Sequence, residues 1–201
     1  MSATIRLLVL GAVRRRERAH GYRVRADLEA WGAHEWSTAT SGSIYHALRS
    51  MTARGLLRAR DTEPSEAGGP PRTEYEITDE GEAEFFSLLR TALARHDQRL
   101  DTLSAAVGFI EDLPRAEAID LLQQRATNMQ RWRESITSSV PDDADLQAWG
   151  AVGSVLDLWL HTADSRVEWT QGLIGRLETG AFEMADDPQR IRSAAPRSGG
   201  S

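Results

Sequence analysis

The order of amphipathic segments in the first 78 residues restricts the fold more than any other feature of the sequence. Apolar residues at three-and-four spacing predict three successive helices, and the two short segments that follow have the pattern of strands. The connection between the strands is too long for a tight hairpin turn. Three helices followed by a two-stranded hairpin with a long tip form the order of a winged helix. The helices are predicted over residues 5–16, 22–31 and 41–53, the strands over residues 56–60 and 73–78, and loops over residues 17–21 and 35–40.

After the hairpin the chain is predicted to be almost wholly helical. The apolar stripe of the last helix, from Trp149 to Leu177, is too wide for a helix on the surface of a monomer, so we expect it to pair two subunits. Residues 186–201 are rich in Pro, Gly and Ser and are predicted to lack a fixed structure. The helices of this region are predicted from residue 78 to residues 95–100, and over residues 103–111, 115–138 and 144–178.

The predicted fold class is therefore mainly α, with an N-terminal winged helix-turn-helix that carries a two-stranded wing and a C-terminal α-helical dimerisation region. We expect three parts along the chain. Residues 1–82 are the winged-helix DNA-binding domain, residues 83–180 are a helical domain for dimerisation and possible effector binding, and residues 181–201 are a flexible tail.

The distribution of charge supports a nucleic-acid partner, although the net charge of -6 argues at first against one. Residues 1–60 contain 11 Arg and 4 acidic residues, a balance of +7, and the rest of the chain has a balance of -13. A basic first segment on an acidic body is typical of a protein that brings one end to DNA and keeps its other surfaces away from the duplex. Six arginines cluster around the second helix, where contact with phosphates and an ordinary solvated connector are both open: Arg14, Arg15, Arg16, Arg18, Arg23 and Arg25.

The sequence has none of the residue patterns that are typical of catalytic sites and metal sites. The chain has no Cys, its five His show no ligand spacing, and it has no nucleophile elbow, phosphate-binding loop or dinucleotide fingerprint. We therefore expect no enzyme activity, no cofactor and no metal. The longest apolar run, Leu7–Val13, is too short for a membrane span, and the N-terminus has no pattern of an export signal, so we expect a cytoplasmic protein.

The third predicted helix has the two faces that a reading helix needs. Ile44, Leu48 and Met51 share one face, so Tyr45 and Arg49 point the other way. The major groove admits one α-helix, where hydroxyls donate to phosphates and an Arg can pair with guanine. Taken alone, the same pattern also fits a helix whose polar face is merely solvated. The outward side chains of this helix are predicted to be Ser43, Tyr45, His46, Arg49 and Ser50.

Several short motifs occur in an order that resembles the PadR family of transcription regulators. Their order and spacing agree over residues 5–90, close to half of the chain. Each motif is weak alone, and together they are specific. The motifs are Leu8-Val9-Leu10-Gly11, His20-Gly21-Tyr22, Ser41-Gly42-Ser43-Ile44-Tyr45-His46-Ala47-Leu48, Gly55-Leu56, and Gly69-Pro70-Pro71-Arg72 followed by Tyr75, Ile77, Thr78 and Gly81.

The resemblance implies a homodimer whose heads enter adjacent major grooves of a palindromic operator. Such proteins are usually repressors that a small molecule, often a phenolic or other planar aromatic compound, releases from DNA. Tyr22 and Tyr45 are similar to the phosphate-contacting tyrosines of the family, Ser43 matches a serine near the start of its reading helix, and Arg72 closes its wing motif. Ser41 stands where many members of the family have a proline, and the predicted wing is acidic. The predicted DNA-binding residues are Tyr22, Ser41, Ser43, Tyr45, His46, Arg49 and Arg72.

For two features of the sequence, a purely structural role remains open beside the functional one. The wing motif that ends at Arg72 could aim this side chain at DNA, or its prolines could simply protect a hairpin from aggregation. Trp132, Trp149 and Trp159 could line a pocket for an aromatic effector, although tryptophans at helical spacing more often pack in a core or a dimer seam. The alternative function is a winged-helix module that binds proteins and not DNA.

Overall fold

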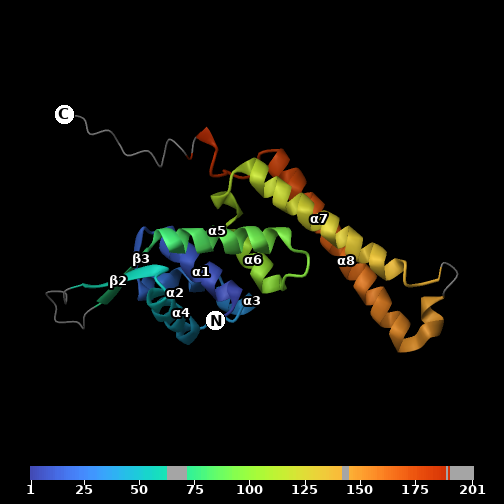
Figure 1. Cartoon of the computed structure of the whole chain (residues 1–201), viewed down its shortest axis with the longest axis horizontal. Helices are drawn as coiled ribbons and strands as arrows, with labels where there is room; N and C mark the ends of the chain where they lie inside the picture. The colour runs from blue at the N-terminus through green and yellow to red at the C-terminus, as the bar shows by residue number, and fades with distance from the viewer. Residues whose placement is uncertain (63–71, 142–144, 189, 191–201) are drawn as a thin grey trace. The chain divides into compact units, whose positions relative to one another are not determined.

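The computed structural model describes residues 1–62, 72–141, 145–188 and 190, and it divides the chain into two compact units (Figure 1). The first unit consists of residues 1–92 and 99–109 and is called the head below. The second consists of residues 93–98 together with the chain from residue 110 onward, and is called the helical unit.

The head is a winged helix, which confirms the predicted fold class. Its three strands form one antiparallel sheet in the order β1-β3-β2, and the residues between β2 and β3, where the wing was predicted, lie outside the description. The elements are α1 Ala3–Arg14, β1 Arg18–His20, α2 Gly21–Ala30, α3 Ala33–Trp36, α4 Ser41–Ala53, β2 Leu57–Thr62, β3 Arg72–Ile77, α5 Asp79–Ala94, whose last two residues belong to the helical unit, and α6 Leu100–Gly108.

Two ordered elements fall wholly or partly within the segments that were predicted as loops. The chain turns at Glu17, whose φ is 59°, and then forms β1, in which Ala19 is buried opposite Tyr75 of β3. Residues 33–36 form the short helix α3. Elements of three and four residues span no more than about one period of a helix or strand pattern, so the sequence pattern could not reveal them.

Helix α4 begins and ends where the sequence predicts. The Thr40 hydroxyl accepts a hydrogen bond from the Ser43 N–H at 3.3 Å and so caps the first turn. Beyond the other end, Gly55 adopts a φ of 74°, which glycine reaches without strain. The predicted inward residues Ile44, Leu48 and Met51 are all buried, and Ala47 is buried with them.

The core of the head surrounds α1, which is buried on all sides. Leu7, Leu8, Val9, Leu10 and Val13 are at most 1% exposed, and the helix contacts α2, α4 and α6. A helix that is apolar all round belongs in the middle of a core.

The helical unit is built on two long antiparallel helices, α7 Arg115–Thr137 and α8 Gly150–Glu178 (Figure 1). Two short 3-10 helices, η1 Ile110–Asp112 and η2 Leu146–Trp149, precede them. The buried residues of α8, among them Gly153, Ala163 and Thr170, fall on one stripe, and α7 covers this side of the helix.

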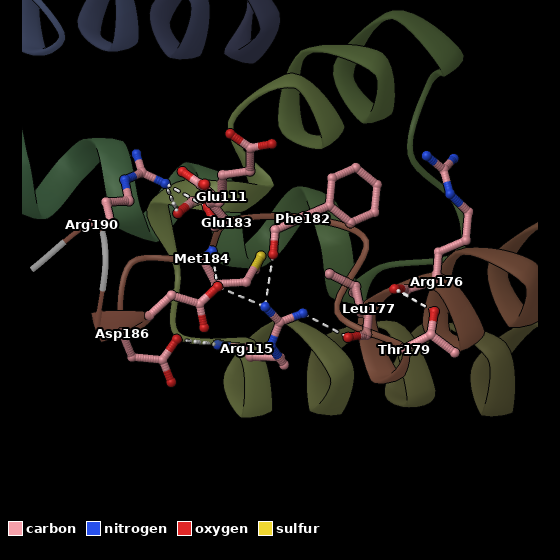
Figure 2. Close-up of polar contacts among 11 residues, drawn as sticks. Glu111, Arg115, Arg176, Leu177, Thr179, Phe182, Glu183, Met184, Asp186 and Arg190 are labelled. Atoms are coloured by element: carbon pink, nitrogen blue, oxygen red, sulfur yellow. Dashed lines mark hydrogen bonds and ion pairs between the residues drawn. The ribbon is translucent and has the colours of Figure 1, made fainter.

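Polar contacts hold the end of α8 against the start of α7 (Figure 2). The Arg115 guanidinium donates to the carbonyl of Leu177 at 2.6 Å, to the carbonyl of Phe182 at 2.7 Å and to the Asp187 carboxylate at 2.7 Å. The Arg115 backbone N–H donates to the Asp186 carboxylate at 3.0 Å, and Arg190 donates to that of Asp112 at 2.9 Å. We call these contacts the C-terminal clasp.

The clasp corrects the prediction of a structureless tail. Residues 181–188 and residue 190, which were expected to lie in that tail, are ordered against the α7–α8 pair. A polar, Pro- and Gly-containing composition does not reveal this, because the order depends on single Asp and Arg side chains that meet partners about 70 residues earlier in the chain. Residues 191–201 lie outside the description.

Candidate nucleic-acid interface

A groove on the head brings together three of the predicted DNA-binding residues. It has a volume of about 680 Å³ and lies where the start of α2 and the outward face of α4 meet the sheet. Tyr22, Tyr45 and Arg49 all line it, and we call it the tyrosine groove. The complete lining is His20, Gly21, Tyr22, Tyr45, Arg49, Thr52, Ala53, Ala59, Thr73 and Tyr75.

The close approach of α2 to α4 depends on Gly21. A Cβ at this position would lie 2.8 Å from Cε1 of Tyr45 and 3.3 Å from a methyl of Leu48, so the aromatic ring would have to move. Gly21 therefore permits the Tyr45 ring to pack beside the first turn of α2. A ring that packing holds in place loses little conformational freedom when its hydroxyl binds a ligand.

Tyr22 is held from two sides and remains open to solvent. Its ring stacks on that of His20, with centroids 5.7 Å apart and planes 11° apart. Arg23 donates to its hydroxyl at 3.2 Å, and the Tyr22 side chain is still 38% exposed. His20 is a groove residue that was not among the predicted contacts, although the His20-Gly21-Tyr22 motif was one of the sequence signals.

The two serines at the start of α4 already have partners within the head. The Ser43 hydroxyl donates to two carbonyls of the preceding loop, at 2.9 and 3.0 Å, so its proton is committed to the helix cap. The Ser41 hydroxyl accepts from Arg25 at 3.3 Å. His46 is exposed on the same helix and is not part of the groove lining. Of the predicted contacts on α4, Tyr45 and Arg49 are the two that face the groove.

Of the predicted wing motif, only Arg72 lies among the described residues. Arg72 begins β3, and its backbone is paired with Thr62 of β2. The residues before it in the wing motif, Gly69-Pro70-Pro71, lie outside the described residues, so both interpretations of this motif stay predictions.

The basic cluster around α2 is tied in part to carboxylates of the head itself. Arg14 donates to Glu82 at 2.8 Å, and Arg16 makes two bonds to Asp27, one of them 2.6 Å long. Both pairs lie partly in solvent, where an ion pair contributes about 0–1 kcal/mol. These pairings favour a connector role for Arg14 and Arg16 over phosphate contact.

The predicted effector residues lie in the helical unit. Trp132 is half-buried, with its ring 6.5 Å from that of His96. Trp149 and Trp159 are 40% and 46% exposed. Their part in effector binding stays a prediction.

These features define a class of protein. Three helices, a three-stranded antiparallel sheet and a helix with an exposed polar face beside an aromatic groove are the parts of a winged-helix domain. Residues 9–87 match the family described as "Transcriptional regulator PadR-like family". In this segment the chain is therefore similar in sequence to members of the PadR-like family.

Solved structures of PadR and of a PadR-like regulator are similar to the chain. Bacillus subtilis PadR in complex with operator DNA is 21% identical, with a TM-score of 0.38 and coverage of 86% of this chain and 98% of that one. A PadR-like transcriptional regulator from Bacillus cereus is 20% identical, with a TM-score of 0.35 and coverage of 88% and 99%. Bacillus subtilis PadR in complex with p-coumaric acid is 20% identical, with a TM-score of 0.34 and coverage of 87% and 99%. No curated protein matches the chain. Among the described residues, no helix has the length and apolar character to cross a membrane.

Proposed function

We propose that this chain is a homodimeric transcriptional repressor that binds a palindromic operator in duplex DNA and leaves it when a small aromatic molecule binds. The observation that carries the proposal is the tyrosine groove, where Tyr22, Tyr45 and Arg49 from two helices line one surface. In this proposal residues 1–82 bind DNA and residues 83–180 pair the subunits, in the cytoplasm.

The chemistry of the groove suits a phosphate backbone with base edges beside it. Phenolic hydroxyls donate to phosphate oxygens and fix the register of a protein on the duplex without reading sequence. An Arg can pair with both acceptors of a guanine. We therefore assign Tyr22 and Tyr45 to phosphates and Arg49 to a base or to an adjacent phosphate.

Exposed apolar side chains in the first half of α8 support the homodimer. Val152, Val155, Leu158 and Trp159 are 43–63% exposed on this one helix. A second copy of the same helix would remove this apolar surface from water, and two-fold pairing of identical patches is the commonest arrangement of soluble oligomers.

Fluorescence anisotropy with a labelled duplex from upstream of the chain's own gene tests DNA binding. We expect binding that exceeds binding to a scrambled duplex of the same length, and that weakens steeply as salt rises because phosphate contacts release counterions. Equal binding to both duplexes, or an affinity that salt leaves unchanged, would contradict the proposal.

The alternative is a winged-helix module that binds other proteins. The net charge of -6 is the feature in its favour, since the body of the chain repels a polyanion. Failure to bind either duplex at low salt, with the chain folded by circular dichroism, would favour this alternative.

A further inference from the structure

One arginine of the basic cluster around α2 has surroundings that differ from those of most of its neighbours. Four members of the cluster lie within ion-pair distance of a carboxylate of the head: Arg14, Arg16, Arg18 and Arg25. Arg23 is exposed, and no carboxylate in the described part of the chain lies within ion-pair distance of its guanidinium. A paired arginine brings its own carboxylate toward DNA, where this negative charge repels phosphates. Arg23 brings a positive charge without that opposition.

The side chain of Arg23 bends back over Tyr22. Consecutive residues of a helix do not face each other, so this contact depends on the length of the arginine side chain. The Arg23 Nε donates to the Tyr22 hydroxyl at 3.2 Å, and the guanidinium carbon lies 5.3 Å from the centroid of the Tyr22 ring. A guanidinium carries several N–H donors, and the bond to Tyr22 uses one of them. The others are available to a ligand beside the same hydroxyl.

His20 helps to hold the Tyr22 ring in this position. Its ring does not cap α2, and its Nδ1 is buried with no hydrogen-bond partner among the residues that the structure describes. The contact that its ring does make is the parallel stack on Tyr22. The Tyr22 hydroxyl therefore has a defined place beside the Arg23 guanidinium before DNA arrives.

The groove next to this pair suits an anion. The described residues that line the tyrosine groove include the cationic Arg49 and no Asp or Glu. A phosphate that approaches Tyr22 thus meets the charge of Arg23 and no carboxylate of the groove lining. Charge-assisted hydrogen bonds between a guanidinium and a phosphate are among the stronger polar contacts of proteins.

We propose that Arg23 and Tyr22 together bind one phosphate of the DNA backbone, which makes Arg23 a further DNA contact outside the reading helix. The guanidinium supplies the charge, and the hydroxyl fixes where the phosphate lies. The four paired arginines of the cluster stay in their ion pairs within the head. The inference rests on the proposed DNA-binding function, because it names a further contact of the same surface.

The test measures binding to the operator duplex and to a scrambled duplex by fluorescence anisotropy over a range of salt concentrations. Each phosphate that a protein neutralises adds about 0.9 to the steepness with which the logarithm of affinity falls against the logarithm of salt concentration. Arg23→Gln should therefore lower this steepness by about 0.9. It should also weaken binding to both duplexes about tenfold at low salt, because a phosphate contact carries no sequence information. An unchanged salt dependence in Arg23→Gln would overturn the proposal, even if affinity fell, because Arg23 would then only support the Tyr22 ring.

Two further variants separate this contact from a general effect of charge. Arg18→Gln is the matched control, because it removes the same charge from β1, where Glu76 lies 3.9 Å from the guanidinium. It should keep the salt dependence of wild type, and a loss as large as that of Arg23→Gln would overturn the assignment to Arg23. Arg23→Lys retains the charge and should retain the salt dependence. A loss there as large as in Arg23→Gln would contradict the role of the charge.

Tyr22→Phe tests whether both groups bind the same phosphate. If they do, the double variant with Arg23→Gln should lose less affinity than the product of the two single losses, since either change alone already weakens the shared contact. Losses that simply multiply would overturn the shared phosphate. Failure of wild type to bind either duplex would be a failure of the proposed function. Normal binding by wild type, with an unchanged salt dependence in Arg23→Gln, would be a failure of this inference alone.

Discussion

Helices α4 and α8 both bury some of their side chains and expose others, and the exposed side chains differ in chemistry. On α4 the exposed side carries Tyr45, His46 and Arg49, which have hydrogen-bonding groups that water satisfies. In the first half of α8 the exposed side chains include two valines, Leu158 and Trp159, which have no groups that water could satisfy. Both helices are bound to the rest of their unit by the same apolar periodicity.

The difference shows how the exposed side of an amphipathic helix indicates its partner. A polar face with rigid aromatic donors costs nothing to expose and is available to a charged ligand such as DNA. An apolar face of several residues costs free energy until another apolar surface covers it, at about 25 cal/mol per Å². The head therefore suits reversible binding, and α8 suits a lasting contact with a second copy.

The largest expected effect comes from making the exposed face of α8 charged. Trp159→Glu should weaken dimerisation by about 2–4 kcal/mol, because a central apolar contact is replaced by a carboxylate that must be desolvated. Light scattering at micromolar concentration should give the dimer mass for wild type and the monomer mass for the variant. Ser154→Glu adds the same charge to another exposed position of α8 and should leave the dimer intact.

A monomeric wild type would contradict the comparison of α4 with α8, because the exposed apolar side chains of α8 would then need no second copy to cover them. So would a Trp159→Glu variant that stays dimeric. Loss of the dimer in Ser154→Glu as well would mean that charge anywhere on α8 is disruptive and that its apolar side has no special role.

The sequence predicted the parts of the fold that repeat a pattern over several turns. Helix α4 is long enough for Ile44, Leu48 and Met51 to define its inward face, and its capping Thr40 and its Gly55 stop are local signals. The C-terminal clasp has no such signal. Arg115 and Asp187 are 72 residues apart, so only the tertiary fold reveals that they meet.

The candidate site was predictable in its residues and not in its shape. Tyr22, Tyr45 and Arg49 come from recognisable motifs, but the sheet that completes their groove depends on the pairing of β1 with β3. Ser43 matched the family pattern, whereas its hydroxyl is committed to the cap of α4, because a serine near a helix start bonds readily to nearby carbonyls.

The next effect concerns the polar face of α4. Arg49→Ala should cost about 1–3 kcal/mol of operator affinity if the guanidinium pairs with a base, and it should reduce discrimination against a scrambled duplex. Tyr45→Phe should weaken binding to both duplexes alike, since its hydroxyl is assigned to a phosphate. Arg99→Ala removes the same charge from the start of α6 and serves as the control. Unchanged operator affinity in the Arg49→Ala, Tyr45→Phe double variant would favour the protein-binding alternative.

A smaller effect on the free energy of unfolding is expected from the polar clasp, which has no counterpart in the core around α1. The head has a core around α1, whereas at the end of α8 the polar clasp adds to the packing of the buried Leu177 and Met184. Arg115→Ala should lower the free energy of unfolding of the chain by about 1–2 kcal/mol, a value discounted because the side chain is 23% exposed. Urea unfolding followed by circular dichroism measures it, with Arg131→Ala, an exposed position on α7, as the control. Equal stability of the Arg115 and Arg131 variants would mean that packing alone holds the clasp.

The smallest effect is the acid response of the clasp. The backbone N–H of Met184 bonds to the Asp187 carboxylate, and with Arg115 it holds the pKa of Asp187 below its ordinary value. A lowered pKa means that the ionised form stabilises the fold at neutral pH and that this contribution is lost as pH falls below about 4 toward the folded pKa. Asp187→Asn keeps an acceptor for Met184 but has no charge to titrate. The melting temperature of wild type should therefore exceed that of Asp187→Asn at pH 7, and the difference should shrink as the buffer is taken below pH 4. A difference that stays constant through this range would show that Asp187 acts through its hydrogen bonds and not its charge.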